Sequence, residues 1–298
     1  MGRKRRGIPV HGWLNIDKPE GMSSAAVVGA VRRITNAQKA GHAGTLDPFA
    51  TGVLPIALGE ATKTVPYLVA EEKEYGFTAR FGGATNTDDI EGQIIQESDH
   101  RPNESDILNM IPSFTGDIIQ IPPAYSAIKI NGERAYKLAR SGEDVVMPER
   151  TVTIYDLRLD EIIDQDHARF TVRCSKGTYI RALARDLAVA LGTVAHLSQL
   201  RRLRVGPFLE KSAISLDKLA ELWQCPAEFE DLLPLTTALD DIPAVAISET
   251  QAIRVRHGND VAVPNQADGT ICALDGDIPL AICKVEGGVA FPVRVFNI

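Results

Sequence analysis

The order of the strand-like segments constrains the fold more than any other feature of the sequence. Residues 150–162 (RTVTIYDLRLDEI) and 168–177 (ARFTVRCSKG) read as two neighbouring strands, and 53–59 and 73–82 are further strand candidates. Strands that follow one another directly outnumber those separated by a helix, which favours hairpins over parallel βαβ units. We therefore predict an α+β fold with a mixed, mostly antiparallel sheet flanked by helices.

Two helices are expected on sequence grounds. Residues 178–192 (TYIRALARDLAVALG) place their apolar side chains on one face, and Gly192 suits the position just beyond a helix end. The alanine- and valine-rich stretch 25–35 suits a buried helix, and Ser23 or Ser24 supplies its N-cap. Both helices would pack on the predicted sheet.

The chain has 298 residues, enough for one large domain with an appendage. We assign residues 1–240 to the larger domain and expect the basic residues 1–9 to form a disordered arm. Residues 241–298 contain one short helix and brief strands separated by Gly, Asp and Pro turns, which indicates a separate small β-rich domain.

Several classes of protein are disfavoured. No run of about 18 apolar residues is present, so a membrane span is not expected. The four cysteines form no CxxC pair, and reduced thiols in a cytoplasmic protein are the default expectation. The six histidines have no metal-ligand spacing with cysteines or acids, so we expect no metal site.

The charges are unevenly distributed along the chain. The net charge of −7 argues weakly against a polyanionic partner, but basic residues gather in 3–6, 129–140, 173–185 and 201–204. The basic clusters are open to two interpretations: one positive face on an acidic protein, or a set of solvated helix faces.

Asp47 is the lone charged residue of the glycine- and proline-rich segment 41–59 (GHAGTLDPFATGVLPIALG). One interpretation is structural, because Asp at an N-cap followed by Pro48 starts many helices. The other is a nucleophilic or general-base carboxylate on a loop, which would need a cationic partner if screened from water. Arg181, at the start of the predicted helix 178–192, is the candidate for that partner.

Two further motifs carry alternative readings. Residues 126–129 (SAIK) match the S-x-x-K pattern of serine acyl-enzymes, but a strand there would place Ser126 and Lys129 on opposite sides. Lys176 and Arg181 near a helix N-terminus suit a phosphate or carboxylate, although an ordinary solvated helix start is equally consistent with them.

Taken together, the motifs resemble the bacterial tRNA pseudouridine-55 synthases, the TruB family. LNIDKPEGMSS resembles the first motif of that family, and GHAGTLDPFATGVLPIALGEATK resembles its catalytic motif. KEY, PPAYSAIKINGERAY, CSKGTYIRALARDL and LRRLRVG continue the match in the expected order. The resemblance covers about residues 10–208, and residues 241–298 are similar in position and texture to the PUA RNA-binding domain of the family.

The resemblance implies a pseudouridine synthase fold and isomerisation of uridine to pseudouridine in the T loop of tRNA, without metal or organic cofactor. The base is flipped out, the C1′–N1 bond is broken, and the uracil is rejoined through C5. Asp47 matches the catalytic aspartate of the family. Three routes for it stay open: addition to C6 of the base, attack on the ribose, or deprotonation of the ribose.

The resemblance also implies roles for other positions. Tyr75 matches an aromatic residue that stacks on the target base and whose hydroxyl joins the later proton step, and Arg181 matches the partner of the aspartate. His42 matches a residue beside the flipped nucleotide, and the motif of Lys18 and Pro19 is mainly structural in the family. Candidates for lining the uracil pocket or contacting the RNA are Tyr179, Leu200, Lys18, Lys129, Lys176, Arg201 and Arg202.

Two alternative functions remain on these grounds. One is a related synthase that acts through a guide-RNA complex with partner proteins. The other is an RNA chaperone that remodels tRNA, a role that is compatible with the chemistry. We expect the tRNA T stem-loop as partner, no obligatory protein partner and a monomer.

Overall fold

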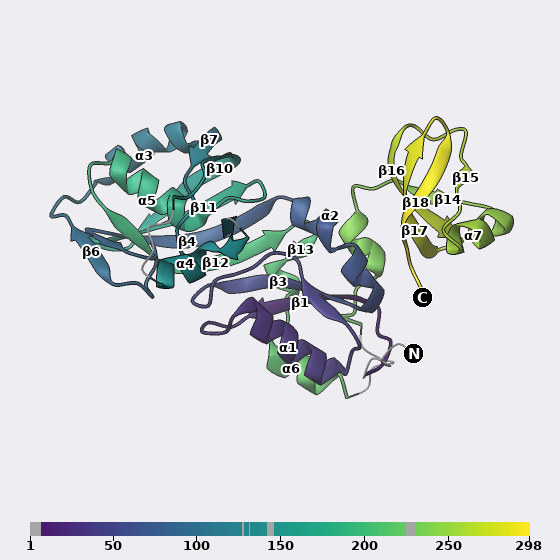
Figure 1. Ribbon diagram of the computed structural model, residues 1–298. Helices are drawn as coiled ribbons and strands as arrows, with labels where there is room; N and C mark the ends of the chain where they lie inside the picture. Colours follow the sequence, from purple (N-terminus) through teal and green to yellow (C-terminus); the bar gives the residue numbers. More distant parts are fainter. Residues whose placement is uncertain (1–6, 127, 131, 142–145, 225–229) are drawn as a thin grey trace.

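A computed structural model of the protein describes residues 7–126, 128–130, 132–141, 146–224 and 230–298. Its main element is a nine-stranded sheet whose path runs β1-β3-β12-β4-β11-β10-β7 (Figure 1). The strands are β1 (Gly12–Lys18), β3 (Thr51–Leu58), β4 (Lys73–Phe81), β7 (Gly116–Gln120), β10 (Arg150–Ile162), β11 (His167–Cys174) and β12 (Ala195–Val205), with the short β2 (Ala40–His42) and β13 (Phe208–Leu209) beside β3 and β12.

The sheet is mixed and mostly antiparallel, as predicted. Its strand pairs are antiparallel except for β12 and β3, which run parallel over Arg201↔Thr51 and Arg202↔Gly52. Two small hairpins project from this domain: β5 (Gly83–Thr85) with β6 (Ile94–Glu97), and β8 (Lys129–Ile130) with β9 (Glu133–Arg134). The Asn–Gly pair that follows residue 130 includes Asn131, which lies outside the described residues.

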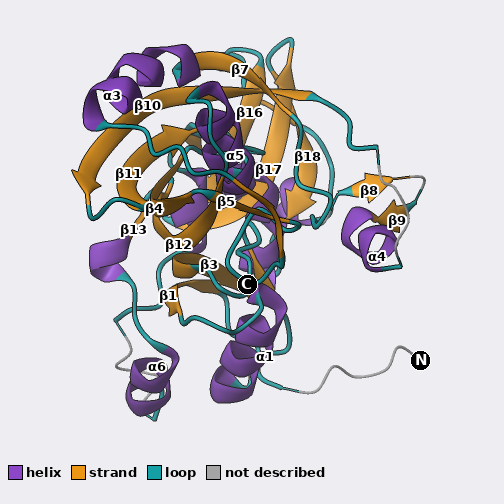
Figure 2. Cartoon of the chain, turned by 90° about the vertical axis from the view of Figure 1, so that its left-hand side faces the viewer, coloured by secondary structure: helices purple, strands orange, loops and turns teal. Residues whose placement is uncertain are grey.

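The helices lie around the sheet in separate groups. In Figures 1 and 2, α1 and α6 lie side by side next to β1, whereas α3 contacts β10 and α5 contacts β12 and β4. The helices of the larger domain are α1 (Ser24–Thr35), α2 (Val65–Ala70), α3 (Glu104–Met110), α4 (Ala135–Arg140), α5 (Ile180–Ala190) and α6 (Leu216–Leu222), with short 3-10 turns η1 (Gly59–Lys63), η2 (Ile111–Phe114), η3 (Glu210–Ser212) and η5 (Leu235–Leu239).

The two predicted helices are α1 and α5. Ser23 is the N-cap of α1, and its hydroxyl accepts a hydrogen bond from the Ala26 amide. Gly192 follows the end of α5 with φ of +74°, a conformation that glycine adopts without a steric penalty. The apolar face of α5 packs against β12 and β4, and this contact fixes the position of the first turn of α5.

The C-terminal domain has a five-stranded sheet in the order β14-β16-β17-β18-β15 and one helix, α7 (Glu249–Arg256). Its strands are β14 (Ala244–Ala246), β15 (Val261–Ala262), β16 (Gly269–Asp275), β17 (Ile278–Glu286) and β18 (Val289–Val295). The helix and the β-rich texture agree with the sequence-based description of residues 241–298.

The two domains share part of their cores. Cys272, Ile282 and Phe296 of the C-terminal domain belong to one buried cluster with Trp13 and Phe208 of the larger domain. The chain end is also tied down by hydrogen bonds, because Lys63 donates to the Val295 carbonyl at 2.7 Å and the Asn297 amide donates to Glu60 at 3.0 Å. The C-terminal domain is therefore packed onto the larger domain and not merely tethered to it.

The structure decides against one open interpretation and shortens one predicted segment. Residues 45–50 lie outside helices and strands, so the Asp47-Pro48 pair forms a turn, closed by the Ala50 amide donating to the Asp47 carbonyl at 3.1 Å, and does not start a helix. The predicted disordered arm extends too far, because the Ile8 amide donates to the Asn36 carbonyl at 2.8 Å; residues 1–6 lie outside the described part.

Two expectations concerned the membrane and the cysteines. Among the described residues, no helix is long and apolar enough to cross a membrane. Cys174, Cys272 and Cys283 are buried and free, and Cys225 lies outside the described residues.

Candidate active site

A buried lysine binds the backbone of the loop that carries Asp47. Lys18, at the end of β1, is fully buried, and its ammonium group donates to the carbonyls of Pro19 (2.8 Å), Pro48 (2.9 Å) and Ala50 (2.6 Å). Burial lowers the pKa of Lys18 to about 8, although the Asp47 carboxylate favours the charged form. Its ammonium group therefore fixes the backbone on the C-terminal side of Asp47.

A serine holds the other side of the same loop. The Ser24 hydroxyl donates to the Leu46 carbonyl at 2.9 Å and accepts from the Leu46 amide at 2.8 Å. Gly52, where β3 begins, has φ of +97°, and a Cβ atom there would lie 2.3 Å from the Arg202 carbonyl oxygen. Only glycine allows β3 to approach β12 this closely, so the loop enters the sheet at a fixed point.

Asp47 and Arg181 form the ion pair that the sequence predicts. Arg181 Nε lies 3.1 Å from Asp47 Oδ2, and Nη2 donates to Oδ1 at 3.3 Å. The Arg181 side chain is only 4% exposed, whereas that of Asp47 is 34% exposed. Asp47 is therefore the member of the pair that a molecule outside the protein can reach.

Asp89 is a second carboxylate on the same guanidinium, and sequence analysis missed it. Arg181 Nη1 donates to Asp89 Oδ2 at 3.1 Å and to the Thr87 carbonyl at 2.8 Å, and Nη2 donates to the Tyr125 carbonyl at 3.0 Å. Asp89 is buried and also accepts from the Thr87 hydroxyl. It lies in an acidic stretch, 88–106, that gave no sign of burial, so only the fold reveals its role.

The electrostatic environment of Asp47 balances opposing effects. Burial raises the pKa of its carboxyl, and the Asp89 carboxylate adds to the rise, whereas the positive charges of Arg181 and Lys18 oppose it. Without these two cations the pKa of the Asp47 carboxyl would be higher still, because an unpaired buried carboxylate favours its protonated form. The cations thus support an anionic Asp47 at the surface of the site.

The neighbouring strands bring three other predicted residues to this region. Tyr75 on β4 lies directly opposite Arg202 on β12, and Leu200 lies opposite Phe77. Tyr75 and Leu200 are buried in the main apolar cluster. Burial raises the pKa of Tyr75, whereas the Arg202 charge opposes the rise. The Arg202 side chain, across from Tyr75, donates to the Gly44 carbonyl in the segment that leads to Asp47.

The predicted contact between Arg202 and RNA phosphates is wrong. Its side chain is buried, with Nε donating to the Val53 carbonyl at 2.7 Å and Nη2 to the Gly44 carbonyl at 3.2 Å. Lys18 is equally inaccessible, which fits the structural role expected of its motif and not a direct contact with substrate. The basic cluster 201–204 indicated a surface, but the Arg202 side chain turns inward and, like Lys18, donates to backbone carbonyls.

Two more predicted residues lie in the segments that lead to Asp47 and to Arg181. His42 ends β2 opposite Ile56, and burial together with the Arg202 charge lowers its pKa, so its imidazole is neutral near pH 7. Tyr179 immediately precedes α5; its amide donates to the Gln120 side chain at 3.1 Å, and the Arg150 guanidinium lies 5.5 Å from the centre of its ring.

The remaining basic candidates lie on the surface. Lys129 and Lys176 are exposed, so both remain candidates for phosphate contacts. Arg201 is partly exposed, but it pairs with Asp17 through two hydrogen bonds of 3.0 Å and also with Glu210. Its charge is balanced within the protein, which makes it a weaker candidate than the two lysines.

The serine-enzyme alternative finds no support in the geometry. Among the described residues the Ser126 hydroxyl has no hydrogen-bond partner, so the Ser126–Lys129 pair needed for acyl transfer is not formed. Within the same described part of the chain, no group of three or more His, Cys, Asp or Glu side chains is arranged to hold a metal ion.

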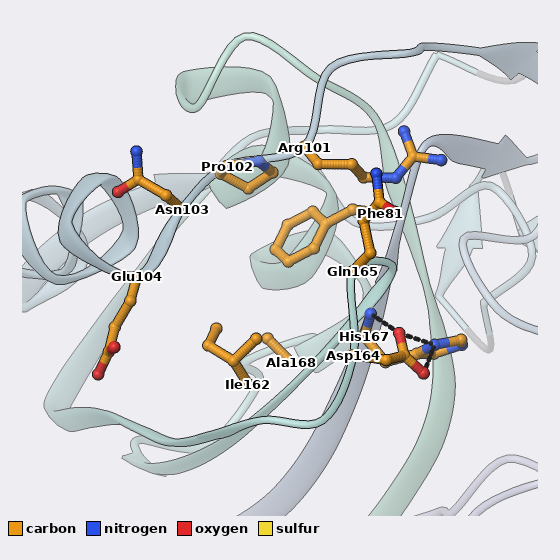
Figure 3. A pocket seen from close by; sticks show the side chains of 10 residues that line it. All are labelled: Phe81, Arg101, Pro102, Asn103, Glu104, Ile162, Asp164, Gln165, His167 and Ala168. Atoms are coloured by element: carbon orange, nitrogen blue, oxygen red, sulfur yellow. Dashed lines mark hydrogen bonds and ion pairs between the residues drawn. The ribbon is translucent and has the colours of Figure 1, made fainter.

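A cavity of about 390 Å³ lies elsewhere, where Phe81, Ile162 and Ala168 form apolar walls and Arg101 and His167 lie at its border (Figure 3). Phe81 is at the opposite end of β4 from Tyr75, roughly 20 Å away at about 3.3 Å per strand residue. The cavity is separate from the Asp47 site.

Comparison with protein families decides the relationship of the chain. Residues 32–180 match the N-terminal domain of the TruB family pseudouridylate synthases, and residues 181–241 match the tRNA pseudouridylate synthase B C-terminal domain. The chain belongs to the TruB family. The second matched stretch contains α5, β12 and α6, so it forms part of the larger domain and not of the β-rich domain 241–298.

Family relatives match over the full length of the chain. The tRNA pseudouridine synthase B of Caulobacter vibrioides is 48% identical over 309 residues and is covered completely, as is this chain. The tRNA pseudouridine synthase B of Gluconacetobacter diazotrophicus is 48% identical, with 98% of this chain and 99% of the relative covered. TruB family members are isomerases, and this chain is one of them.

Solved structures agree on the fold. A Cbf5-Nop10-Gar1 complex contains a chain with a TM-score of 0.74 and 31% identity, covering 96% of this chain and 84% of the other. An H/ACA RNP bound to a substrate RNA containing 2′-deoxyuridine contains a chain with a TM-score of 0.74 and 28% identity, covering 100% and 92%. Both domains of this TruB family member therefore have counterparts in solved structures.

Proposed function

We propose that this chain converts uridine 55 in the T loop of tRNA to pseudouridine, with Asp47 as the carboxylate that acts on the target nucleotide. The observation that carries the proposal is the partly exposed Asp47 carboxylate, paired with a buried Arg181. Full-length relatives named tRNA pseudouridine synthase B supply the substrate class.

The reaction is an isomerisation that changes no oxidation state overall. The C1′–N1 bond breaks, a C1′–C5 bond forms, N1 gains a proton, and the hydrogen originally on C5 leaves as a proton. Each of the three routes for Asp47 requires a carboxylate anion at the start. Arg181 and Lys18 favour that anion, and Asp89 and the carbonyls of Thr87 and Tyr125 hold the guanidinium in place.

The target base has to leave the folded T loop before Asp47 can reach it. Extrusion costs a few kcal/mol, and stacking on an aromatic side chain such as Tyr75 returns about 1–3 kcal/mol per base. His42, Tyr179 and Leu200 are the further residues proposed to line the uracil pocket. The exposed lysines 129 and 176 and the C-terminal domain, proposed as a PUA-type RNA-binding domain, add contacts to the rest of the tRNA.

The experiment uses tRNA carrying tritium at C5 of uracil and measures tritium release by the purified chain. Wild-type protein should release the label from position 55, Asp47→Asn should release none, and both should bind tRNA. Asp160→Asn is the matched control, because Asp160 is an exposed carboxylate on β10 that hydrogen-bonds Thr171 and lies outside the site. Absence of release by the wild type, or full release by Asp47→Asn, would refute the proposal.

Two alternatives give different results in the same assay. A synthase that depends on a guide RNA and partner proteins would be inactive on bare tRNA. The 48% identity over the full length of a tRNA pseudouridine synthase B favours activity of the isolated chain. A tRNA chaperone role is compatible with the enzyme activity. It would appear as tRNA refolding by Asp47→Asn protein and as an unchanged cellular phenotype of that variant.

A further inference from the structure

Gln120 is a buried amide that the chemistry described above does not use. We propose that Gln120 is a positioning residue for the isomerisation: its side chain fixes the start of α5 and thereby the Arg181 guanidinium that holds Asp47. This inference rests on the proposed function and extends it to a residue of β7, the strand at one end of the large sheet.

The first support is the burial of an amide where an apolar side chain is expected. Gln120 is the last residue of β7 and is 1% exposed, whereas its neighbours Ile119 and Ile121 are 67% and 47% exposed. A buried amide without partners lowers stability, and an apolar residue would fill the same space at lower cost. The exchange of polar and apolar positions is therefore explained by what the amide binds.

The second support is a pair of reciprocal hydrogen bonds. The Tyr179 amide donates to Gln120 Oε1 at 3.1 Å, and Gln120 Nε2 donates to the Tyr179 carbonyl at 3.3 Å. Tyr179 is the N-cap residue of α5, and the Leu183 amide donates to the same carbonyl at 3.0 Å. Gln120 thus binds both main-chain polar groups of the residue at which α5 begins.

The third support is the short path from these hydrogen bonds to the ion pair. Arg181 lies two residues after Tyr179, and long side chains in a helix lean back toward its N-terminus. Its Nη2 donates to the Tyr125 carbonyl at 3.0 Å and to Asp47 Oδ1 at 3.3 Å. Gln120 and Tyr125 are the ends of one short segment, and each end is bound to the start of α5. A shift of this helix start would therefore displace the guanidinium from Asp47.

The test is Gln120→Met, which keeps the length of the side chain and removes both hydrogen bonds, with tritium release measured in single turnover. Asp89 still binds Arg181 Nη1, so the guanidinium should be displaced and not released. We expect tritium release to slow by about 5- to 100-fold, while the tRNA Kd changes less than about twofold because Gln120 is buried. A rate within about twofold of the wild type, or a loss confined to tRNA binding, would overturn the inference.

Thr193→Val is the matched control, just beyond the other end of α5. Thr193 is 5% exposed and its hydroxyl donates to the His100 carbonyl at 2.9 Å, so this variant also loses a buried hydrogen bond to the main chain. Its Tm should fall, as that of Gln120→Met should, but its rate of release should stay within about twofold of the wild type. Equal losses of rate in the two variants would mean that Gln120 acts through stability alone, against the inference.

A second measurement is independent of activity and of whether the methionine variant folds. Gln120→Asn keeps a polar amide but is one methylene shorter, so it cannot hold both main-chain groups of Tyr179 at hydrogen-bond distance. In ¹⁵N-labelled protein the Arg181 Nε–H resonance, assigned with Arg181→Lys, should shift in Gln120→Asn and stay in place in Thr193→Val. An unmoved resonance in Gln120→Asn contradicts the positioning role, whereas failure of wild-type protein to release tritium contradicts the proposed function alone.

Discussion

Replacing Phe296 should reveal how far the two domains depend on each other. Phe296 is 4% exposed and belongs to the buried cluster that contains Trp13, Cys272 and Ile282, whereas Phe291 on β18 is 45% exposed. Phe→Ala at a buried site costs about 3–5 kcal/mol, through lost transfer free energy and the cavity left behind. The same change at an exposed site costs no more than about 0.5–1 kcal/mol, which makes Phe291→Ala the matched control.

Thermal unfolding followed by circular dichroism measures the difference. A loss of about 3–5 kcal/mol of unfolding free energy corresponds to a Tm lower by roughly 6–20 °C, at about 2–4 °C per kcal/mol for a chain of this size. We expect Phe296→Ala to show this loss and Phe291→Ala to melt within about 3 °C of the wild type. Because the cluster spans both domains, both domains of Phe296→Ala should unfold at the lower Tm, and not the C-terminal sheet alone.

Equal Tm values for the two phenylalanine variants would refute the shared core. The same reasoning applies to deletion of residues 241–298, which takes Cys272, Ile282 and Phe296 out of the cluster. That truncation should weaken tRNA binding, leave some activity and also lower the stability of the remaining domain. A truncated protein that melts at the temperature of the full chain, or a well-folded one without activity, would contradict this account.

The other predictions concern charges. Arg181→Ala leaves the Asp47 and Asp89 carboxylates without their shared cation, so turnover should fall far more than tRNA affinity and unfolding should cost about 3–5 kcal/mol less; a large loss of binding with normal turnover would argue against it. Burial lowers the pKa of Lys18 from 10.5 to about 8, so between these values the unfolded chain binds more protons. Urea titrations should therefore show that the unfolding free energy of the wild type rises with pH relative to that of Lys18→Met, by at most about 3 kcal/mol. If the difference between the two unfolding free energies is the same at pH 8 and pH 10.5, the effect is excluded. The tRNA affinity should fall steadily as salt is added, because phosphate contacts release counterions; a salt-independent Kd in a filter-binding titration would show that such contacts are few.

Local pattern was sufficient to predict β3, β4, β10, β11 and the two main helices, but not β12 (Ala195–Val205), which lies between β3 and β4 in the sheet. Strand alternation and the capping signals at Ser23 and Gly192 act over a few residues, and tertiary packing did not override them. The Asp47–Arg181 pair was also predictable, because a lone carboxylate in an apolar segment needs a cation and few were available at a helix start.

Other parts of the site depend on contacts that the sequence cannot display. Asp89 reaches Arg181 from 92 positions away, and Arg202 reaches the Gly44 carbonyl from 158 positions away. A charged residue in a strand normally indicates an exposed side chain, so the burial of Arg202 is opposite to what its local sequence indicates. A helix start at Asp47 was one of two interpretations that its local signal allowed, but Lys18 and Ser24 bind the backbone of the loop and residues 45–50 form no helix.

The short parallel pairing of β3 with β12 has a consequence for how the chain becomes an enzyme. It joins two parts of the large sheet through Arg201↔Thr51 and Arg202↔Gly52, about 150 positions apart in the chain. Asp47 enters from one side of this seam, whereas Tyr75 and Arg181 belong to the other. Neither part alone contains the whole of the proposed reaction centre. A partly assembled chain would therefore have Asp47 without Arg181, and the proposed activity requires that β3 and β12 have paired.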